Sequence, residues 1–341
     1  LGGNPQLWTP GIRWGVRPGS PVHLTELFGP VLAVMCARDL AHAVALANRT
    51  GYGLTAGLES LDPREWAYWQ EHIRAGNLYI NRPTTGAIVG RQPFGGMGKS
   101  AFGAGIQAGG PHYALQFLDV EETGPPPLAP VRDTSPLWRL AGRWEEMLAS
   151  GRFPAGERAE IGRAVVALRS LLAAMEREFA PADAYHLRGQ ENRHRFLPAG
   201  TVVVRLDPRD GIFETVVRLA AARAAGNRVR LSLPPGLDTA AARFLSGPEG
   251  RRLAAGVSRV EEGEEELIAA LDDTCRLRAA APDRVSGRLL AAAAARGVHV
   301  ARAPVLMEGR LELLHGLRGQ SLSIDTHRWG NLGFRAEAFE D

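Results

Sequence analysis

Residues 81–96 have the sequence NRPTTGAIVGRQPFGG, and this stretch decides the fold. Glycine and proline are too frequent in it for a helix or a central strand, so it predicts a long ordered loop. Such loops are usually functional. Residues 77–81, NLYIN, have the pattern of a short buried strand that leads into it. A strand followed by a glycine-rich loop can present backbone N–H groups to an anion, although a tight surface crossover has a similar composition.

The whole string resembles the substrate-anchoring loop of the aldehyde dehydrogenase superfamily. Within that superfamily it is similar to L-glutamate-γ-semialdehyde (1-pyrroline-5-carboxylate) dehydrogenase, in the form fused to proline dehydrogenase in proline utilization A. KSAFG at residues 99–103 and AGGPHY at residues 108–113 extend the resemblance, which covers residues 5–120. It implies an α/β fold and an NAD-dependent oxidation of the semialdehyde to glutamate in proline catabolism.

The resemblance assigns three residues of the loop to the substrate. It implies that the backbone N–H groups of Gly86 and Ala87 hold the substrate α-carboxylate and that Phe94 packs against its aliphatic chain. The family often has serine where this chain has Ala87. A backbone contact survives that change, whereas a hydroxyl contact is lost.

The sequence ELFGP at residues 26–30 supplies two further candidates. A carboxylate and an aromatic ring two residues apart in an extended segment project to the same side. Taken alone, the pentapeptide favours a loop glutamate and a core phenylalanine. The resemblance instead implies that Glu26 and Phe28 contact the nicotinamide ribose and ring of NAD.

No residue of this chain is assigned a catalytic role. The superfamily uses a cysteine thiolate nucleophile and a general-base glutamate, and the resemblance places both upstream of Leu1 together with the first NAD-binding half. We expect Cys36 to be an inert residue at the end of a buried strand, and Cys275 has no recognisable context. The chain is therefore expected to be a fragment that is inactive by itself.

Composition limits the other functions. Of 341 residues, 45% are hydrophobic and 23% charged, as in soluble globular proteins. No apolar run reaches the ~20 residues that span a bilayer, and no targeting peptide is recognised. Two cysteines form no disulfide framework or metal cluster, which favours the cytoplasm. The net charge is only +3 and the arginines lie among acids, so we expect no nucleic-acid binding by this segment.

Strand and helix patterns alternate along the first domain, residues 1–121. We predict strands at residues 31–35, 54–58 and 77–81, and helices at 39–48 and 62–75 with Gly76 as the stop. Residues 114–120 resemble the strand that leads to the oligomerisation arm of the superfamily, and the resemblance therefore implies a further strand there. His112 is interpreted as a loop histidine. This order favours a mostly parallel sheet.

A proline-rich linker is predicted at residues 122–135, and a second domain at 136–307. This domain resembles a degenerate Rossmann-like copy of the superfamily's NAD-binding unit. Its predicted elements are a long helix at 155–179, a strand at 201–206, a helix at 213–225 and strands at 229–233 and 276–278. Compared with that unit of the superfamily, Asp210 stands in place of an asparagine that stabilises the oxyanion, and Ser232 stands in place of a lysine. Ala281-Pro282-Asp283 stands in place of a glycine-rich turn. The domain is therefore expected to be non-catalytic and to bind no NAD.

Residues 308–341 resemble a C-terminal motif that packs on the catalytic core. His327 beside Asp325 could suggest catalysis, but a structural role is favoured. The parent is expected to be a cytoplasmic homo-oligomer with an upstream proline dehydrogenase domain that holds FAD and could place it at the inner membrane. The competing interpretation is a purely structural or interaction module. The sequence leaves open the oligomeric state, an upstream DNA-binding module and any other ligand of the second domain.

Overall fold

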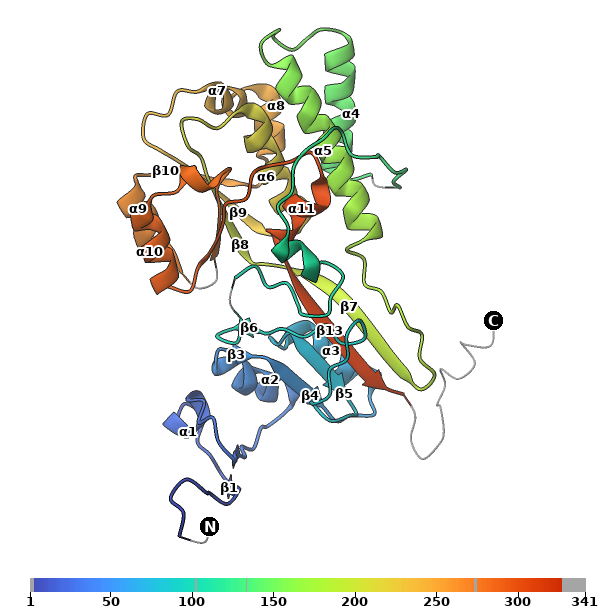
Figure 1. Ribbon diagram of the computed structural model, residues 1–341, viewed down its shortest axis with the longest axis vertical. Helices are drawn as coiled ribbons and strands as arrows, with labels where there is room; N and C mark the ends of the chain where they lie inside the picture. The colour runs from blue at the N-terminus through green and yellow to red at the C-terminus, as the bar shows by residue number, and fades with distance from the viewer. Residues whose placement is uncertain (1–2, 102, 133, 273–274, 327–341) are drawn as a thin grey trace.

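The computed structural model describes residues 3–101, 103–132, 134–272 and 275–326. Figure 1 shows two lobes along the long axis of the molecule. The lower lobe contains the first third of the chain, and most of the later residues form the upper lobe. Two strands of the later sequence, β7 (Gln190–Pro198) and β13 (Leu317–Asp325), descend from the upper lobe into the lower one.

The first third of the chain is built from short elements. They are β1 (Gly11–Arg13), α1 (Pro21–Leu24), β2 (Val31–Ala33), α2 (Leu40–Arg49), β3 (Tyr52–Gly53), β4 (Thr55–Leu58), α3 (Pro63–His72), β5 (Asn77–Ile80), β6 (Met97–Gly98) and the 3-10 helix η1 (Tyr113–Phe117). Asp39 and Asp62 cap α2 and α3, each by accepting a bond from a backbone N–H in the first turn.

The sheet of the lower lobe joins distant parts of the sequence. Its four strands lie in the order β4-β5-β13-β7. β5 pairs in parallel with β4 and with β13, so that Leu78 lies beside Leu322, and β13 pairs antiparallel with β7 along its whole length. Leu78, Ile80, Leu322 and Ile324 pack with Trp69 of α3 in one buried cluster. The tail therefore supplies a central strand of this lobe.

The upper lobe contains a second, larger sheet and its helices. Its elements are α4 (Pro136–Ala149), α5 (Arg158–Arg177), β8 (Thr201–Arg205), α6 (Ile212–Ala224), β9 (Arg228–Leu233), α7 (Ala240–Ser246), α8 (Pro248–Leu253), β10 (Ser258–Glu261), α9 (Glu264–Ala269), β11 (Cys275–Arg278), the 3-10 helix η2 (Pro282–Arg284), α10 (Gly287–Ala295), β12 (His299–Ala301) and α11 (Gly309–Leu314). The five strands lie in the order β10-β9-β8-β11-β12, and every pair is parallel.

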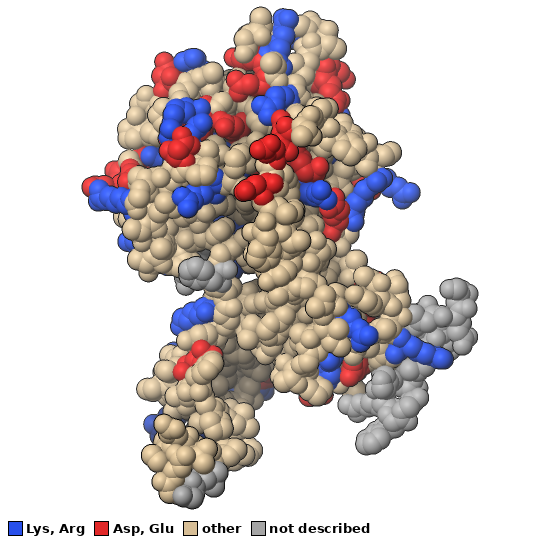
Figure 2. Space-filling view, in the orientation of Figure 1, with Lys and Arg blue, Asp and Glu red and all other residues tan. Residues whose placement is uncertain are grey.

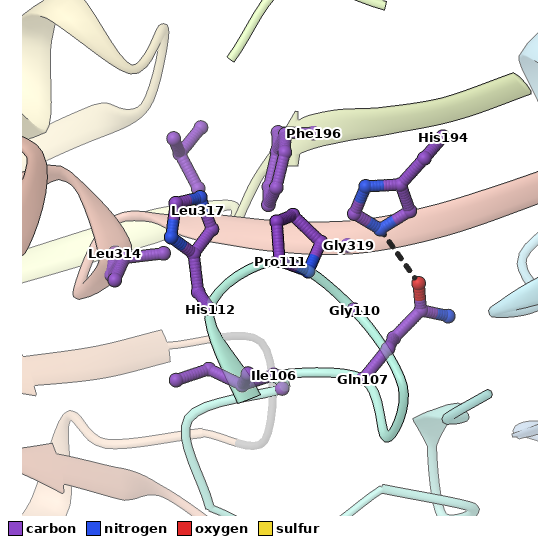
Figure 3. A pocket seen from close by; sticks show the side chains of 11 residues that line it. Ile106, Gln107, Gly110, Pro111, His112, His194, Phe196, Leu314, Leu317 and Gly319 are labelled. Carbon is purple, nitrogen blue, oxygen red and sulfur yellow. Dashed lines mark hydrogen bonds between the residues drawn. The ribbon is translucent and has the colours of Figure 1, made fainter. Parts of the chain in front are cut away.

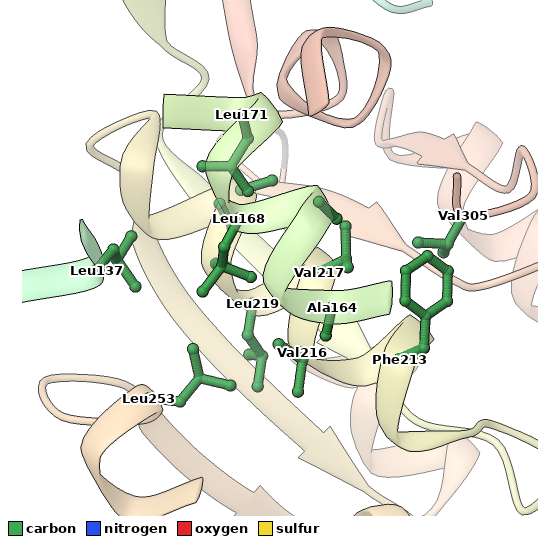
Figure 4. Packing of buried hydrophobic residues seen from close by; sticks show 14 of the residues in the cluster. Leu137, Ala164, Leu168, Leu171, Phe213, Val216, Val217, Leu219, Leu253 and Val305 are labelled. Carbon is green, nitrogen blue, oxygen red and sulfur yellow. The ribbon is translucent and has the colours of Figure 1, made fainter. Parts of the chain in front are cut away.

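The main hydrophobic core lies where α4, α5 and α6 meet this sheet. Leu168 of α5 and Leu219 of α6 are fully buried and belong to the same cluster (Figure 4). Trp144 of α4 is also fully buried, and its Nε1 donates to Glu249 at 3.0 Å. Each such side chain contributes about 1.5–3 kcal/mol when it leaves water. The predicted helix at residues 155–179 is confirmed as α5, whereas α4 was not predicted.

The predicted α/β class is confirmed, with corrections in the first third of the chain. The strand expected at 31–35 is shorter, and its residues are exposed or half-buried because β1 is its single sheet partner in the described chain. The predicted strand at 114–120 is wrong. Residues 113–117 instead form the 3-10 helix η1, in which Leu115 N–H bonds His112 O at 3.2 Å, and Phe117 is 73% exposed. In the described chain, no strand pairs with this segment.

The helix predicted at residues 62–75 is also shorter than expected. Asp62 and Pro63 begin it as predicted, but it ends at His72 with Ile73 as its C-cap. In the described part of the chain, no helix has the length and apolar character that crossing a bilayer requires.

Candidate functional site

The 81–96 loop leaves the sheet directly after β5, whose residues are all buried. Asn81 has a φ of 59°, a left-handed conformation that few non-glycine residues adopt. Its side chain accepts a hydrogen bond from Ser60 N–H at 2.9 Å, and its own N–H donates to Leu58 O at 2.9 Å. These bonds fix the direction in which the loop starts.

Asn77 of β5 joins the returning end of the loop to the sheet. Its fully buried side chain donates to Pro93 O at 3.0 Å and accepts from Gly95 N–H at 3.1 Å. The returning chain passes so close to Gly76 that a Cβ atom there would lie 1.7 Å from Gly95 O. Gly76 is therefore needed for this close approach and is not the helix stop that the sequence suggested.

Strands β7 and β13 hold the middle of the loop. Gln92 is 2% exposed, and its Oε1 accepts from Ile88 N–H at 3.0 Å. Its Nε2 donates to Asn192 Oδ1 of β7. Ser323 of β13 donates to the same Asn192 oxygen at 2.8 Å. The loop is thus bonded to residues that lie a hundred or more positions away in the sequence.

A second network centres on Gln107, which is 3% exposed. Its Nε2 donates to Gly76 O at 2.9 Å and to Gly95 O at 3.1 Å, which leaves Oε1 as an acceptor 3.0 Å from His194 Nε2 (Figure 3). Burial, with a smaller effect of His112, lowers the pKa of His194 to about 4. His194 is therefore neutral at pH 7, and its Nε2 carries the proton that it donates.

A small cavity lies beside this network, between the loop that carries His112 and strands β7 and β13 (Figure 3). Its volume is about 10 Å³, enough for one water molecule. His112 Nε2 is buried and has no partner among the described residues, and burial lowers the pKa of His112. His112 stacks on Phe179 with ring centres 5.2 Å apart. The cavity is too small for a substrate and belongs to the support of the loop.

The residues predicted to hold the substrate lie on the supported loop. Gly86 and Ala87 are exposed near its middle. Gly86 has a φ of 82°, and no atom lies within 4 Å of the place that a Cβ would occupy. Phe94 lies on the returning arm, is 38% exposed, and pairs through its backbone with Ala108 at 2.8 and 2.9 Å. A rigid base and an open tip are therefore combined in one loop.

The residues predicted to contact NAD lie elsewhere. Glu26 and Phe28 are exposed in the irregular segment between α1 and β2. Phe28 is 94% exposed and has a φ of 46°, an unusual backbone conformation for an aromatic residue. Figure 1 shows β1 and α1 at the lower end of the molecule, whereas β5 and β6, which flank the 81–96 loop, lie further up. In the described chain, no hydrogen bond or ion pair joins Glu26 or Phe28 to the loop.

The two cysteines differ in environment. Cys36 is exposed, which corrects the prediction of a buried strand end, because β2 stops at Ala33. Cys275 is buried in β11. Among the described residues, no group of histidine, cysteine, aspartate and glutamate has a geometry that could hold a metal ion.

In the second sheet, the order of the strands reverses between β8 and β11, the place where a doubly wound sheet binds its ligand. Ion pairs fill this place. Arg218, with a fully buried side chain, donates to Asp210 Oδ2 at 2.5 Å, and Arg284 donates to Asp210 Oδ1 at 2.8 Å. Arg209, directly before Asp210, pairs with Asp283 at 2.7 Å.

Ser232 is likewise committed to the protein interior. It is fully buried at the end of β9, and its Oγ accepts from Arg205 Nη1 at 3.0 Å. Pro282 and Asp283 lie in η2, where a dinucleotide-binding sheet would have its glycine-rich turn. Asp210, Ser232 and the 281–283 turn, the three places where the sequence differs from an NAD-binding unit, therefore all make contacts within the protein.

The polar side chains that support the loop were not predicted. Their signal is weak but present, because an asparagine or glutamine inside a buried or glycine-rich stretch must find hydrogen-bond partners. Asn77 and Gln107 are such residues. In β7, Asn192, His194 and Phe196 alternate with charged residues, which would place them on one face of a strand.

Comparison with known proteins agrees with this architecture. Residues 2–122 match the model of the aldehyde dehydrogenase family. The bifunctional protein PutA of Rhizobium meliloti is 34% identical over 82% of this chain, which covers 22% of that protein. The 1-pyrroline-5-carboxylate dehydrogenase of Geobacillus sp. strain WCH70 is 43% identical over 33% of this chain and 21% of its own length.

A solved structure extends the similarity to both lobes. Proline utilization A from Corynebacterium freiburgense is 34% identical and aligns over 95% of this chain and 28% of its own, with a TM-score of 0.70. The chain thus spans about a fifth to a quarter of the length of these relatives. Residues 2–122 are thus identified as an aldehyde dehydrogenase domain.

Proposed function

We propose that this chain supplies the substrate-anchoring part of an NAD-dependent dehydrogenase that oxidises L-glutamate-γ-semialdehyde to glutamate in proline catabolism. The names of its relatives support this substrate. The observation that carries the proposal is the 81–96 loop, whose base is fixed by buried Asn77 and Gln92 while Gly86 stays open to solvent. A backbone held in this way can offer N–H groups to the α-carboxylate without reorganising when it binds.

Glu26 and Phe28 are proposed to contact the nicotinamide ribose of NAD. Both side chains are exposed and free of the core. The same part of the chain has a largely apolar surface, and Figure 2 shows few charged side chains at the lower end of the molecule. Trp8, Trp14 and Leu32 are 77%, 76% and 58% exposed. An apolar surface of this kind marks an interface, here with the part of the dehydrogenase that carries the nucleophile.

The second sheet is proposed to be a non-catalytic, degenerate Rossmann-like domain. Its strand order matches that of a dinucleotide-binding sheet. At the place where phosphates would bind, however, Asp210 and Asp283 form ion pairs with arginines. A packing role for this domain, with the tail strand β13, agrees with these contacts. The whole protein is further proposed to be a cytoplasmic homo-oligomer with an FAD-containing proline dehydrogenase domain. A second activity is supported by one relative, which is named a bifunctional protein.

Replacing Gly86 in the whole enzyme tests the anchoring role. Gly86→Val should reduce kcat/KM for glutamate semialdehyde far more than for a short aldehyde without a carboxylate. Gly236→Val is the matched control, because Gly236 has a similar φ of 66° and equally open surroundings but lies in the upper lobe. Equal losses for both aldehydes would show that the loop is only scaffold.

A further inference from the structure

A large cavity separates the two lobes on the side of β6 and α10. Its volume is about 560 Å³, within the range of small-molecule sites. Glycines of the 96–105 segment form one wall, and β11, β12 and α10 form the other. Figure 2 shows the molecule narrowing between the lobes at this level. The cavity is separate from both the 81–96 loop tip and the place between β8 and β11.

The cavity is lined by cations. Its charged lining residues are Lys99, Arg276, Arg296, Arg302 and Arg318. None of the described lining residues is acidic. Positive charges that line one cavity repel one another, so this arrangement costs free energy unless an anion binds among them.

Arg276 is the most buried of these cations. It is 2% exposed, and its Nη atoms donate to the carbonyl oxygens of Ala104, His315 and Leu317 at 2.8–3.1 Å. Its Nε is buried without a partner. Burial, then the neighbouring Arg318, lowers the pKa of Arg276 to about 9. No carboxylate of the described chain compensates this charge.

Arg318 of β13 is the second uncompensated cation. Its Nε is buried without a partner, and no hydrogen bond or ion pair links its side chain to the described residues. Burial lowers its pKa. Other buried arginines of the upper lobe are paired, since Arg218 binds Asp210 and Arg278 binds Glu312 at 2.6 Å. The two arginines that lack a carboxylate partner, Arg276 and Arg318, therefore both line the cavity, where an anion from outside can approach them.

We propose that this cavity binds a small organic phosphate, with Arg276 and Arg318 at its inner end and Lys99, Arg296 and Arg302 at its rim. Guanidinium groups match the geometry of phosphate oxygens, and the glycines let the backbone approach a ligand closely. His299 also lines the cavity. Burial, followed by Arg276 and Arg318, lowers its pKa to about 4, so it is neutral at pH 7 and can donate a hydrogen bond without adding charge.

Calorimetric titration of the 341-residue chain tests this proposal. The probes are inorganic pyrophosphate, ATP and citrate at constant ionic strength set with NaCl, which screens non-specific attraction. Pyrophosphate and ATP are expected to bind, and citrate to bind at least about tenfold more weakly. Absence of pyrophosphate binding would overturn the proposal, and citrate binding as tight as that of pyrophosphate would overturn its phosphate specificity.

Two variants and a control locate the site. Arg318→Gln and the exposed Arg302→Gln should each weaken pyrophosphate binding by about tenfold or more. Because Arg302 lies outside the core, its variant keeps the test valid if Arg318→Gln fails to fold. Arg288→Gln is the control, because Arg288 is an exposed arginine of α10 that pairs with Glu265 and does not line the cavity. An equal loss in the Arg288 variant would show that binding depends only on net charge.

Discussion

His194 Nε2 lies 3.0 Å from Gln107 Oε1, and this contact connects a strand from the second half of the sequence to the glycine-rich segment of the first third. The same glutamine amide donates to Gly76 O and Gly95 O. One buried side chain thus sets the spacing between β5, the returning arm of the 81–96 loop and β7. The loop is positioned by the second half of the chain as much as by its own sequence.

Replacing Gln107 should therefore loosen the loop. Gln107→Ala leaves Gly95 O and the His194 N–H without their partner and removes one of the two donors to Gly76 O, which keeps Ser321 N–H. Each group left unsatisfied costs about 1–3 kcal/mol. We expect a lower free energy of unfolding in urea and, in the whole enzyme, a higher KM for glutamate semialdehyde. Gln116→Ala is the control, since Gln116 is exposed and makes one long bond of 3.4 Å to Tyr113 O. Equal stability of the two variants would contradict a positioning role.

Buried histidines should make the chain less stable in mild acid. Burial lowers the pKa values of His194 and His299 to about 4 from 6.5. Between pH 6.5 and 4 the unfolded chain binds more protons than the folded chain, so stability is fully present above pH 6.5 and falls as the pH falls through this window. Each histidine contributes a slope of up to about 1.4 kcal/mol per pH unit.

Unfolding free energies measured at several pH values test this sign. The slope between pH 6.5 and pH 5 should become shallower in His194→Gln. His72→Gln, at an exposed histidine of α3, is the matched control variant. A wild-type chain that is as stable at pH 5 as at pH 7 would contradict the prediction.

Local patterns in the sequence predicted α2, α5, α6, β5, β8 and β9 within a few residues of their ends. These elements have strong periodicity, clear caps or continuous apolar runs. β7 was not predicted, because its sequence QENRHRFLP is rich in charged residues and becomes a strand through pairing with β13. The strand predicted at 114–120 is wrong because this segment bonds within local turns, as in Leu118 N–H to Leu115 O at 3.4 Å, and pairs with no described strand.

The sequence indicated the loop of the candidate site but not the residues that support it. The 81–96 loop is visible in the sequence because glycine and proline density marks an ordered loop. The roles of Gly86 and Phe94 are implied by the family resemblance and stay predictions. The supports Asn77, Gln92 and Gln107 are not, because a polar residue does not show which distant strand will satisfy it.

Asp210→Asn should leave the second sheet without NAD affinity and should destabilise it. The substitution removes the charge that compensates fully buried Arg218, and breaking such a pair costs about 3–5 kcal/mol. Calorimetry with NAD and urea unfolding measure the two effects. Asp238→Asn is the control, because the pair of Asp238 with Arg243 is exposed. Micromolar NAD binding by wild type or Asp210→Asn that persists when Arg318→Gln is added would overturn the non-catalytic assignment.

The 341-residue chain by itself is expected to oxidise no aldehyde. Neither cysteine has a nucleophile's surroundings, because Cys275 is buried in β11 and Cys36 follows an exposed two-stranded ribbon. Purified chain should produce no NADH from glutamate semialdehyde, and Cys36→Ala should change nothing. NAD-dependent turnover that Cys36→Ala abolishes would refute this expectation.

Breaking the pairing of the tail strand should unfold the lower lobe. Ser321 of β13 donates its N–H to Gly76 O at 2.9 Å and its Oγ to Pro93 O at 2.6 Å. Ser321→Ala removes only the hydroxyl bond, at a cost of about 1 kcal/mol, and should keep the sheet. Ser321→Pro also removes the N–H from a central strand, which should separate β13 from β5 and leave the 81–96 loop unsupported.

Hydrogen exchange at the β5 amides distinguishes these outcomes. Protection of Leu78 and Ile80 should be retained in Ser321→Ala and largely lost in Ser321→Pro, whereas amides of α5 in the upper lobe should stay protected in both, since the main hydrophobic core is untouched. Removing residues 308–341 should reproduce the proline variant in the lower lobe, because it removes β13 altogether. In the whole enzyme the same deletion should impair assembly, or transfer of the intermediate between its two active sites. Normal β5 protection in Ser321→Pro would show that the lower lobe folds without the tail, and the tail would then lose its role in holding the substrate loop.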